Sequence, residues 1–187
     1  SELGKTFTVQ NIESKEKTKK GVMPFTTSTL QQACSIKFNY GSSRTMNIAQ
    51  KLYEGIDIGT ETTGLISYMR TDSTRLSNIF VTDTLNYIEK TYGKEYVGNV
   101  KVSKKTENVQ DAHEAIRPTS IIRTPESVKE FLSTEEYKVY SIIYYRALAS
   151  LMKDSKVKQT TILLDNNNYT FKSTGQITVF DGFLKVY

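Results

Sequence analysis

The stretch from Ser133 to Leu164 reads STEEYKVYSIIYYRALASLMKDSKVKQTTILL and changes its hydrophobic period partway along. Its first four residues have the spacing of a capping box, in which a serine and a glutamate three positions later satisfy the first free amides of a helix. Apolar and aromatic residues then recur at helical spacing: Tyr137, Tyr140, Ile143, Tyr144, Ala147, Leu148 and Leu151. After Lys153 the pattern alternates with period two, which predicts strands. A long helix is therefore expected to lead directly into a β-rich segment.

The β-rich character is predicted at both ends of the chain. Towards the C-terminus, residues 156–164 and 169–173 are expected to form strands around an Asp-Asn-Asn-Asn turn, and residues 176–180 a third strand. Towards the N-terminus, residues 6–12 alternate like a half-buried strand. The polar residues 15–21 are interpreted as a solvated hairpin tip, in preference to a phosphate-contacting patch.

The middle of the chain is predicted to be mainly helical. Capping boxes, apolar spacing and terminal glycines indicate helices over residues 28–38, 45–54 and 78–92, with a short helix from Pro125. The expected fold is therefore α+β. A mainly helical domain (residues 28–153) is inserted into a β-rich domain formed by residues 1–27 and 154–187.

The composition is that of a globular chain and excludes several classes of protein. Hydrophobic residues make up 37% and charged residues 24%, so the chain is not of the disordered type. No apolar run approaches the roughly 20 residues that cross a bilayer, and no N-terminal signal stretch is present. The single cysteine, Cys34, is predicted to be a buried thiol, which fits a reducing cytoplasm. One cysteine and one histidine cannot build a zinc site of the usual kind.

The first candidate for chemistry is the segment at residues 64–75, GLISYMRTDSTR. On a short strand Tyr68 and Arg70 would point the same way, because residues two apart share a face. A phenol has a pKa of about 10 in water and needs help to act as a nucleophile. A neighbouring guanidinium could stabilise the developing phenolate and grip a phosphate. Packing remains the alternative, because the chain has 12 tyrosines.

The second candidate is the segment at residues 110–119, QDAHEAIRPT. His113 is the only histidine of the chain, and Arg117 follows it closely. A cationic imidazole beside an arginine could cradle a phosphate, or His113 could move a proton. A surface histidine with a helix-end arginine is the alternative. The net charge of +5 and the pI near 9.1 are compatible with a polyanionic partner without requiring one.

Four ordered segments resemble those of bacterial type IA DNA topoisomerases. These are residues 24–33 (PFTTSTLQQA), 64–73 (GLISYMRTDS), 112–119 (AHEAIRPT) and 175–183 (GQITVFDGF). The resemblance thus covers nearly the whole chain. Met69 and the sequence of residues 114–117 (EAIR) resemble the topoisomerase I branch more closely than topoisomerase III.

The resemblance implies an ATP-independent isomerase that relaxes negatively supercoiled DNA by cutting one strand, passing the other and resealing. By match of motif, Tyr68 would be the nucleophile that becomes linked to a 5′-phosphate. Arg70 would stabilise the transition state, and His113 would hold a backbone phosphate near the break. Asp72 would orient its neighbours, and Arg117 is a weaker candidate for phosphate contact. The β-rich segments would belong to the arch and gate that carry the helical domain.

The same resemblance places the cofactor elsewhere. The family's Mg²⁺ is bound by an acidic cluster in an N-terminal toprim domain, and this chain contains no such motif. The expected partners are a single-stranded segment of negatively supercoiled DNA and the remaining domains of a parent enzyme, in the cytoplasm and without a membrane. Without the toprim domain, the chain alone is expected to be inactive.

Two other functions remain open from the residues alone. A non-catalytic nucleic-acid-binding module predicts salt-sensitive binding and no special role for Tyr68. A structural or protein-interaction piece would use the tyrosine-rich helix that starts near Ser133 as a contact face. That helix is better explained as core, because its aromatic residues are interleaved with Ile, Leu and Ala.

Overall fold

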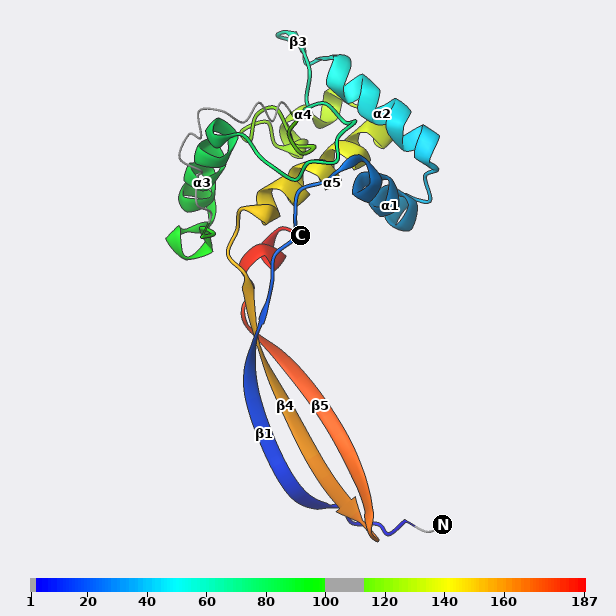
Figure 1. The fold of residues 1–187 in the computed structure, drawn as a ribbon, viewed down its shortest axis with the longest axis vertical. Coiled ribbons are helices and arrows are strands. Elements are labelled where there is room, and N and C mark those ends of the chain that lie inside the picture. The colour runs from blue at the N-terminus through cyan, green and yellow to red at the C-terminus, as the bar shows by residue number, and fades with distance from the viewer. Residues whose placement is uncertain (1–2, 100–112) are drawn as a thin grey trace. The chain divides into compact units, whose positions relative to one another are not determined.

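The computed structural model describes residues 3–99 and 113–187 and confirms a mixed α+β fold (Figure 1). The chain divides into two compact units. The first combines the residues up to Lys20 with Asp154–Lys185, and the second combines Gly21–Lys153 with Val186–Tyr187. Residues 21–27, which the sequence assigned to the β-rich part, pack in the helical unit. The division into functional domains stays a prediction.

The β-rich unit is one antiparallel sheet of three long strands in the order β1-β4-β5 (Figure 1). Their bounds are β1 Thr8–Lys19, β4 Ser155–Asn166 and β5 Tyr169–Phe180. Asn167 and Asn168 join β4 to β5 with φ angles of 49° and 65°. Asparagine tolerates this left-handed conformation better than most residues, and a two-residue turn of this kind matches the twist of a hairpin. The predicted turn is confirmed at Asn167 and Asn168, whereas Asp165 and Asn166, which the prediction included in it, belong to β4.

Two predictions about this sheet were wrong. Residues 15–19 are not a hairpin tip, because β1 continues to Lys19 and pairs with β4 throughout, from Lys15 opposite Gln159 to Lys19 opposite Ser155. The expected break after residue 173 is also missing, because Gly175 stays paired with Thr160 inside one continuous strand. In both places the unbroken central strand supplies backbone partners that local polarity does not reveal.

The helical unit is built around one buried helix. The helices are α1 Thr27–Phe38, α2 Ser42–Glu54, α3 Asn78–Tyr92, α4 Pro125–Val128 and α5 Thr134–Ser150. Short 3-10 turns lie at Lys94–Tyr96 and Lys129–Phe131, and β2 (Ile56–Asp57) pairs with β3 (Thr62–Thr63). The core helix α5 packs against α2 and α4. The bounds of α3 and the capping box of α5 are as predicted, whereas α2 begins three residues earlier.

Two tyrosines of α5 lie in the core, as the spacing predicted, whereas Tyr137, which the same spacing included, is only half-buried. Tyr140 and Tyr144 are fully buried, and burial raises the pKa of both hydroxyls. Each hydroxyl donates to a backbone carbonyl, Tyr140 to Arg123 at 2.6 Å and Tyr144 to Ile121 at 2.7 Å. These two bonds fix residues 121–123 on the surface of α5.

Two features of α1 complete the unit. The helix is capped by Thr26 and Thr29, which exchange side-chain and backbone hydrogen bonds, and not by Ser28 as predicted. Cys34 is completely buried as expected, and burial raises the pKa of its thiol to about 11. None of the helices in the described residues has the length and apolar character needed to span a membrane.

Candidate active site

The tyrosine-bearing segment is an extended loop and not the predicted strand. Its backbone hydrogen bonds go to separate segments, which leaves only an isolated bridge between Ile66 and Pro118. Leu65 donates to the carbonyl of Leu52 at the end of α2 at 2.8 Å, and Ser67 donates to the carbonyl of Arg117 at 2.9 Å. At Gly64 the chain passes so close to α2 that a Cβ would lie 2.6 Å from the Tyr53 carbonyl oxygen.

The loop buries one set of side chains and exposes the other. Leu65, Ile66 and Met69 are buried, whereas Tyr68 keeps 46% of its surface exposed and Arg70 is also exposed. Tyr68 and Arg70 are thus held outward by a backbone anchored on buried neighbours.

Thr27, the first residue of α1, clamps the loop just after Tyr68. Its hydroxyl donates to the Met69 carbonyl at 2.7 Å and accepts from the Thr71 amide at 2.9 Å. Its own amide donates to the Thr71 carbonyl at 2.9 Å. The hydroxyl also lies 3.1 Å from the Thr71 carbonyl oxygen, so four hydrogen bonds at one residue restrict the backbone on both sides of Arg70.

The predicted site residues gather around two open pockets. One, of about 420 Å³, is lined by Tyr68 together with Tyr53, Ser67, Thr71, His113, Glu114 and Arg117. The other, of about 460 Å³, is lined by Arg70 and Asp72 together with Thr27, Ser28, Gln31, Thr71 and His113. Thr71 and His113 line both pockets, so the structure brings all five predicted residues into one region.

Ser67 joins the two motifs that the sequence singled out. Its hydroxyl donates to the Ala115 carbonyl at 2.7 Å and accepts from the Arg117 amide at 2.9 Å. The amide of Ile116 donates to the Phe25 carbonyl at 2.8 Å, which ties the second motif to the residues before α1. His113 is exposed at the start of this anchored segment, on the pocket side.

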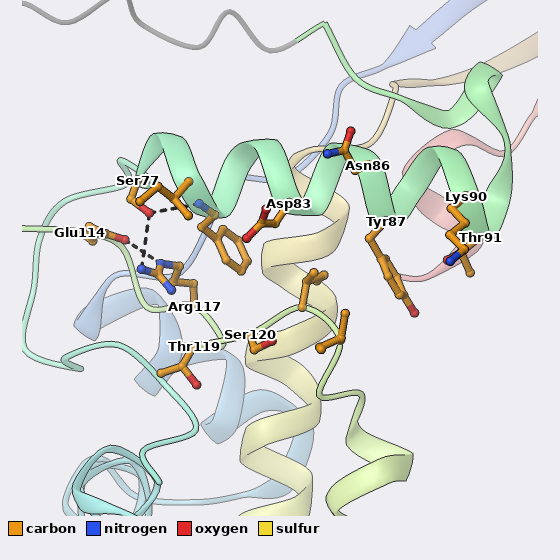
Figure 2. Close-up of a pocket in the computed structure, with 14 residues that line it drawn as sticks. Ser77, Asp83, Asn86, Tyr87, Lys90, Thr91, Glu114, Arg117, Thr119 and Ser120 are labelled. Atoms are coloured by element: carbon orange, nitrogen blue, oxygen red, sulfur yellow. Dashed lines mark hydrogen bonds and ion pairs between the residues drawn. The ribbon is translucent and has the colours of Figure 1, made fainter.

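Arg117 is held by its own segment. Its Nε donates to the Glu114 carboxylate at 2.6 Å, and one terminal nitrogen donates to the Pro118 carbonyl at 3.0 Å. The guanidinium also lies over the Phe80 ring, 4.8 Å from its centre. Figure 2 shows Arg117 between Glu114 and Ser77, with dashed lines to both. These contacts favour a role in shaping the pocket over direct contact with a phosphate.

The pKa of the Glu114 carboxyl lies below its ordinary value. Burial by itself would raise it, but the hydrogen bond and charge of Arg117 outweigh that effect, with help from the Ser77 amide and the charge of Arg75. Glu114 is therefore held as a carboxylate that orients Arg117.

Glu114→Gln should destabilise the protein in a pH-dependent way. A group whose folded-state pKa is lowered stabilises the protein above its unfolded value of 4.5, and that contribution is lost as pH falls through the lower folded value. We expect a loss of about 2 kcal/mol in the free energy of unfolding near pH 7, and a smaller loss as the pH falls below the unfolded value. Urea unfolding of the unmodified protein and of Glu114→Gln at several pH values measures this difference in the free energy of unfolding.

Glu61→Gln is the matched control for this prediction. Glu61 pairs with Arg123 at 2.8 Å, but its side chain is largely in solvent, so its loss should cost less than about 1 kcal/mol. A Glu114→Gln penalty that stays equal at neutral and acid pH would contradict the role given to the carboxylate.

Tyr53 is a site residue that the sequence did not identify. It lies in the last turn of α2, where its ring is 5.2 Å from that of Tyr68 at an angle of 61° and lines the same pocket. An edge-to-face pair of this kind restricts the orientation of both rings. Its position at the end of α2 carried no signal of this contact.

The described residues offer no group of three or more His, Cys, Asp or Glu side chains that could hold a metal ion. Asp72 and Glu114, the acidic groups of the two motifs, line different pockets. The donor set in the described part of the chain therefore does not fit a magnesium site of its own.

Comparison with known proteins agrees over the full length of the chain. The sequence model of the DNA topoisomerase family matches residues 1–187. The DNA topoisomerase 1 proteins of Rickettsia felis and Rickettsia prowazekii are each 44% identical to the chain, over 185 and 186 residues. These alignments cover 97% of the chain and 24% of each relative, so the chain spans about a quarter of their length. The structure of full-length topoisomerase I from Thermotoga maritima matches with a TM-score of 0.86 at 39% identity, over 96% of this chain and 29% of that one.

Proposed function

The chain belongs to the bacterial type IA DNA topoisomerases, and on that premise we propose that it carries the strand-cleaving tyrosine of an enzyme that relaxes negatively supercoiled DNA. The supporting observation is the placement of Tyr68. Its exposed side chain lies on an anchored loop, and His113 lines both its pocket and the neighbouring pocket of Arg70. Such an arrangement can position one phosphodiester between a nucleophile and two basic groups.

In the proposed reaction the Tyr68 hydroxyl oxygen attacks the phosphorus of the scissile phosphodiester. A bond forms between the tyrosine oxygen and phosphorus, and the bond from phosphorus to the 3′-oxygen breaks. The 3′-oxygen takes up a proton as the tyrosine hydroxyl loses one, and the 5′-phosphate stays on Tyr68. The reverse attack by the 3′-hydroxyl reseals the strand after passage of the other strand. No ATP is needed, because one phosphate ester replaces another.

The other residues position the phosphate and its charge. Arg70 is exposed beside the pocket, and its planar guanidinium suits two phosphate oxygens at once. His113 would hold a backbone phosphate from the wall that the two pockets share. Asp72 lines the pocket of Arg70 and would orient its neighbours. For Arg117 the ion pair with Glu114 favours a positioning role over the phosphate contact that the motif implied.

The Mg²⁺ of the reaction is proposed to be bound outside this chain, by the toprim domain of the parent enzyme. No step above passes through the ion, because the described residues do not offer it a site. It follows that the chain alone should form no covalent adduct with DNA, although it contains the nucleophile.

A paired measurement tests this function. The parent enzyme and the isolated chain are each mixed with negatively supercoiled plasmid and Mg²⁺ without ATP, and with single-stranded DNA quenched in detergent. We expect the parent to relax the plasmid and to form an adduct, and the isolated chain to do neither.

Each contrary result points to a different error. A magnesium-dependent adduct formed by the isolated chain would contradict its expected inactivity. It would also contradict the proposal that the Mg²⁺ of the reaction is bound outside this chain. Salt-sensitive DNA binding without adduct or relaxation in the parent would favour a non-catalytic nucleic-acid-binding module.

A further inference from the structure

A large groove lies along α3, next to the candidate active site. It has a volume of about 880 Å³, within the roughly 300–1,000 Å³ of typical small-ligand sites. One wall is α3 and the other is formed by residues 119–122, as Figure 2 shows. We call it the α3 groove. Apart from Glu114 and Arg117, which it shares with the Tyr68 pocket, no residue of its lining has a part in the proposed cleavage reaction.

The α3 groove and the Tyr68 pocket share a wall. Glu114 and Arg117 line both cavities, and their ion pair, with an Nε to Oε2 distance of 2.6 Å, stands between them. A DNA strand held at Tyr68 would lie on the other side of this wall, next to the groove. The shared wall makes a neighbouring nucleotide of that strand a candidate occupant.

The walls of the groove are apolar and partly aromatic. Phe80 and Ile121 are nearly buried at 4% and 3% exposure, whereas Ile79 and Ile122 remain exposed at 78% and 74%. Tyr87 projects into the same space from α3 (Figure 2). Large apolar side chains on both walls favour a flat ring that can pack against them, as nucleobases do on protein side chains.

Among the polar residues that line the groove, Asp83 and Ser120 can bind the edge of such a ring. Asp83 projects from α3 on the side of Ser120 (Figure 2). Asp83 is exposed and Ser120 is half-buried, and in the described part of the chain neither side chain forms a hydrogen bond or an ion pair with the protein. A carboxylate accepts hydrogen bonds from an exocyclic amine and repels a phosphate. Arg117 is already paired with Glu114, and Lys90, the other cation of the lining, lies towards the opposite end of α3 (Figure 2). At the Arg117 end of the groove the charge left for a ligand is therefore the Asp83 carboxylate.

We propose that the α3 groove receives one unstacked, amino-bearing base of the DNA strand held at Tyr68, with Asp83 as the group that reads it. This inference rests on the proposed function, because the strand must be bound at Tyr68. Cytosine, adenine and guanine offer an exocyclic amine, whereas thymine does not. The groove thereby adds a base preference close to the break. Single-stranded DNA favours this binding, because an unpaired base leaves its stack at a lower cost than a base paired in a duplex.

The test combines removal of a base from the DNA with a substitution of Asp83 in the parent enzyme. Oligonucleotides with a single cleavage site carry an abasic position at each of several places beside the break. We expect one position at which loss of the base lowers the adduct yield of the unmodified enzyme about tenfold. Thymine at that position should also give a lower adduct yield than an amino-bearing base. The Asp83→Ala enzyme should give a lower adduct yield with the intact oligonucleotide. Removal of the base at that position should then lower its yield little further.

Glu89→Ala is the matched control, since Glu89 lies on the exposed surface of the same helix outside the groove. It should behave like the unmodified enzyme at every position. Ser120→Ala is a second variant, and it leaves α3 unchanged. It should partly reduce the sensitivity of the adduct yield to the base at the same position. Normal adduct formation with equal base sensitivity in Asp83→Ala and unmodified enzyme would overturn the groove proposal alone. Absence of any Tyr68-linked adduct would instead overturn the proposed function.

Discussion

Tyr68→Phe in the parent enzyme should abolish the covalent protein–DNA adduct and plasmid relaxation. The substitution removes one oxygen atom and leaves the ring, which lies edge-to-face with Tyr53. Because 46% of the Tyr68 surface is exposed, the loss of its hydroxyl should change stability little. Loss of a nucleophile should lower the cleavage rate by at least about three orders of magnitude. A large loss of activity without a loss of stability is therefore the expected result.

The measurement uses single-stranded DNA labelled at its 3′ end. If Tyr68 takes the 5′-phosphate, the labelled fragment stays attached to the protein and shifts on a denaturing gel. Tyr53→Phe is the control, because it makes the same change on a ring 5.2 Å away in the same pocket. It should keep the adduct. An adduct that persists in Tyr68→Phe and disappears in Tyr53→Phe would move the nucleophile to Tyr53.

The elements that sequence reasoning predicted are those whose signals are local. The bounds of α3, the capping box of α5 and the Asn167–Asn168 turn each depend on residues a few positions apart. The failures depend on distant partners. The charged residues 15–19 of β1 look like a loop until β4, about 140 positions later, supplies a paired strand. Local polarity cannot report such a partner.

The residues of the candidate site also fall into those identified from the sequence and those that only the structure revealed. Tyr68, Arg70 and His113 were identified because they lie in motifs that resemble a known family. Thr27 clamps the loop from 42 and 44 positions away, and Ser67 bridges to residues 48 and 50 positions away. Neither contact has a local sequence pattern. Thr27 lies inside a segment with family resemblance, which is the one signal that could have pointed to it.

The Glu114–Arg117 pair shows how the two kinds of information combine. The motif placed Arg117 among phosphate contacts, whereas the structure places it in an ion pair that walls off the Tyr68 pocket from the α3 groove. A side chain engaged by a carboxylate, a carbonyl and an aromatic face is poorly placed to grip DNA as well. Arg70 is the better candidate for the arginine that contacts phosphate.

Arg70→Ala should therefore lower the cleavage rate about 10²–10³-fold, the usual loss when one preorganised charge-stabilising group is removed. Among the described residues Arg70 has no ion-pair partner, so its guanidinium is available to the substrate. Arg70→Lys keeps the charge but loses the planar fork, and should recover only part of the rate. Single-turnover cleavage at saturating DNA measures the chemical step separately from binding.

Arg44→Lys is the control, because Arg44 pairs with Glu135 and lines neither active-site pocket. It should cleave at the normal rate. If Arg70 acts on the developing charge, the defect of Arg70→Ala must persist at saturating DNA, because extra substrate cannot replace an interaction made in the transition state. A defect that disappears at high DNA concentration would assign Arg70 to ground-state binding. The guanidinium would then be one phosphate contact among several, and the charge stabilisation would have to come from His113 or from outside the chain.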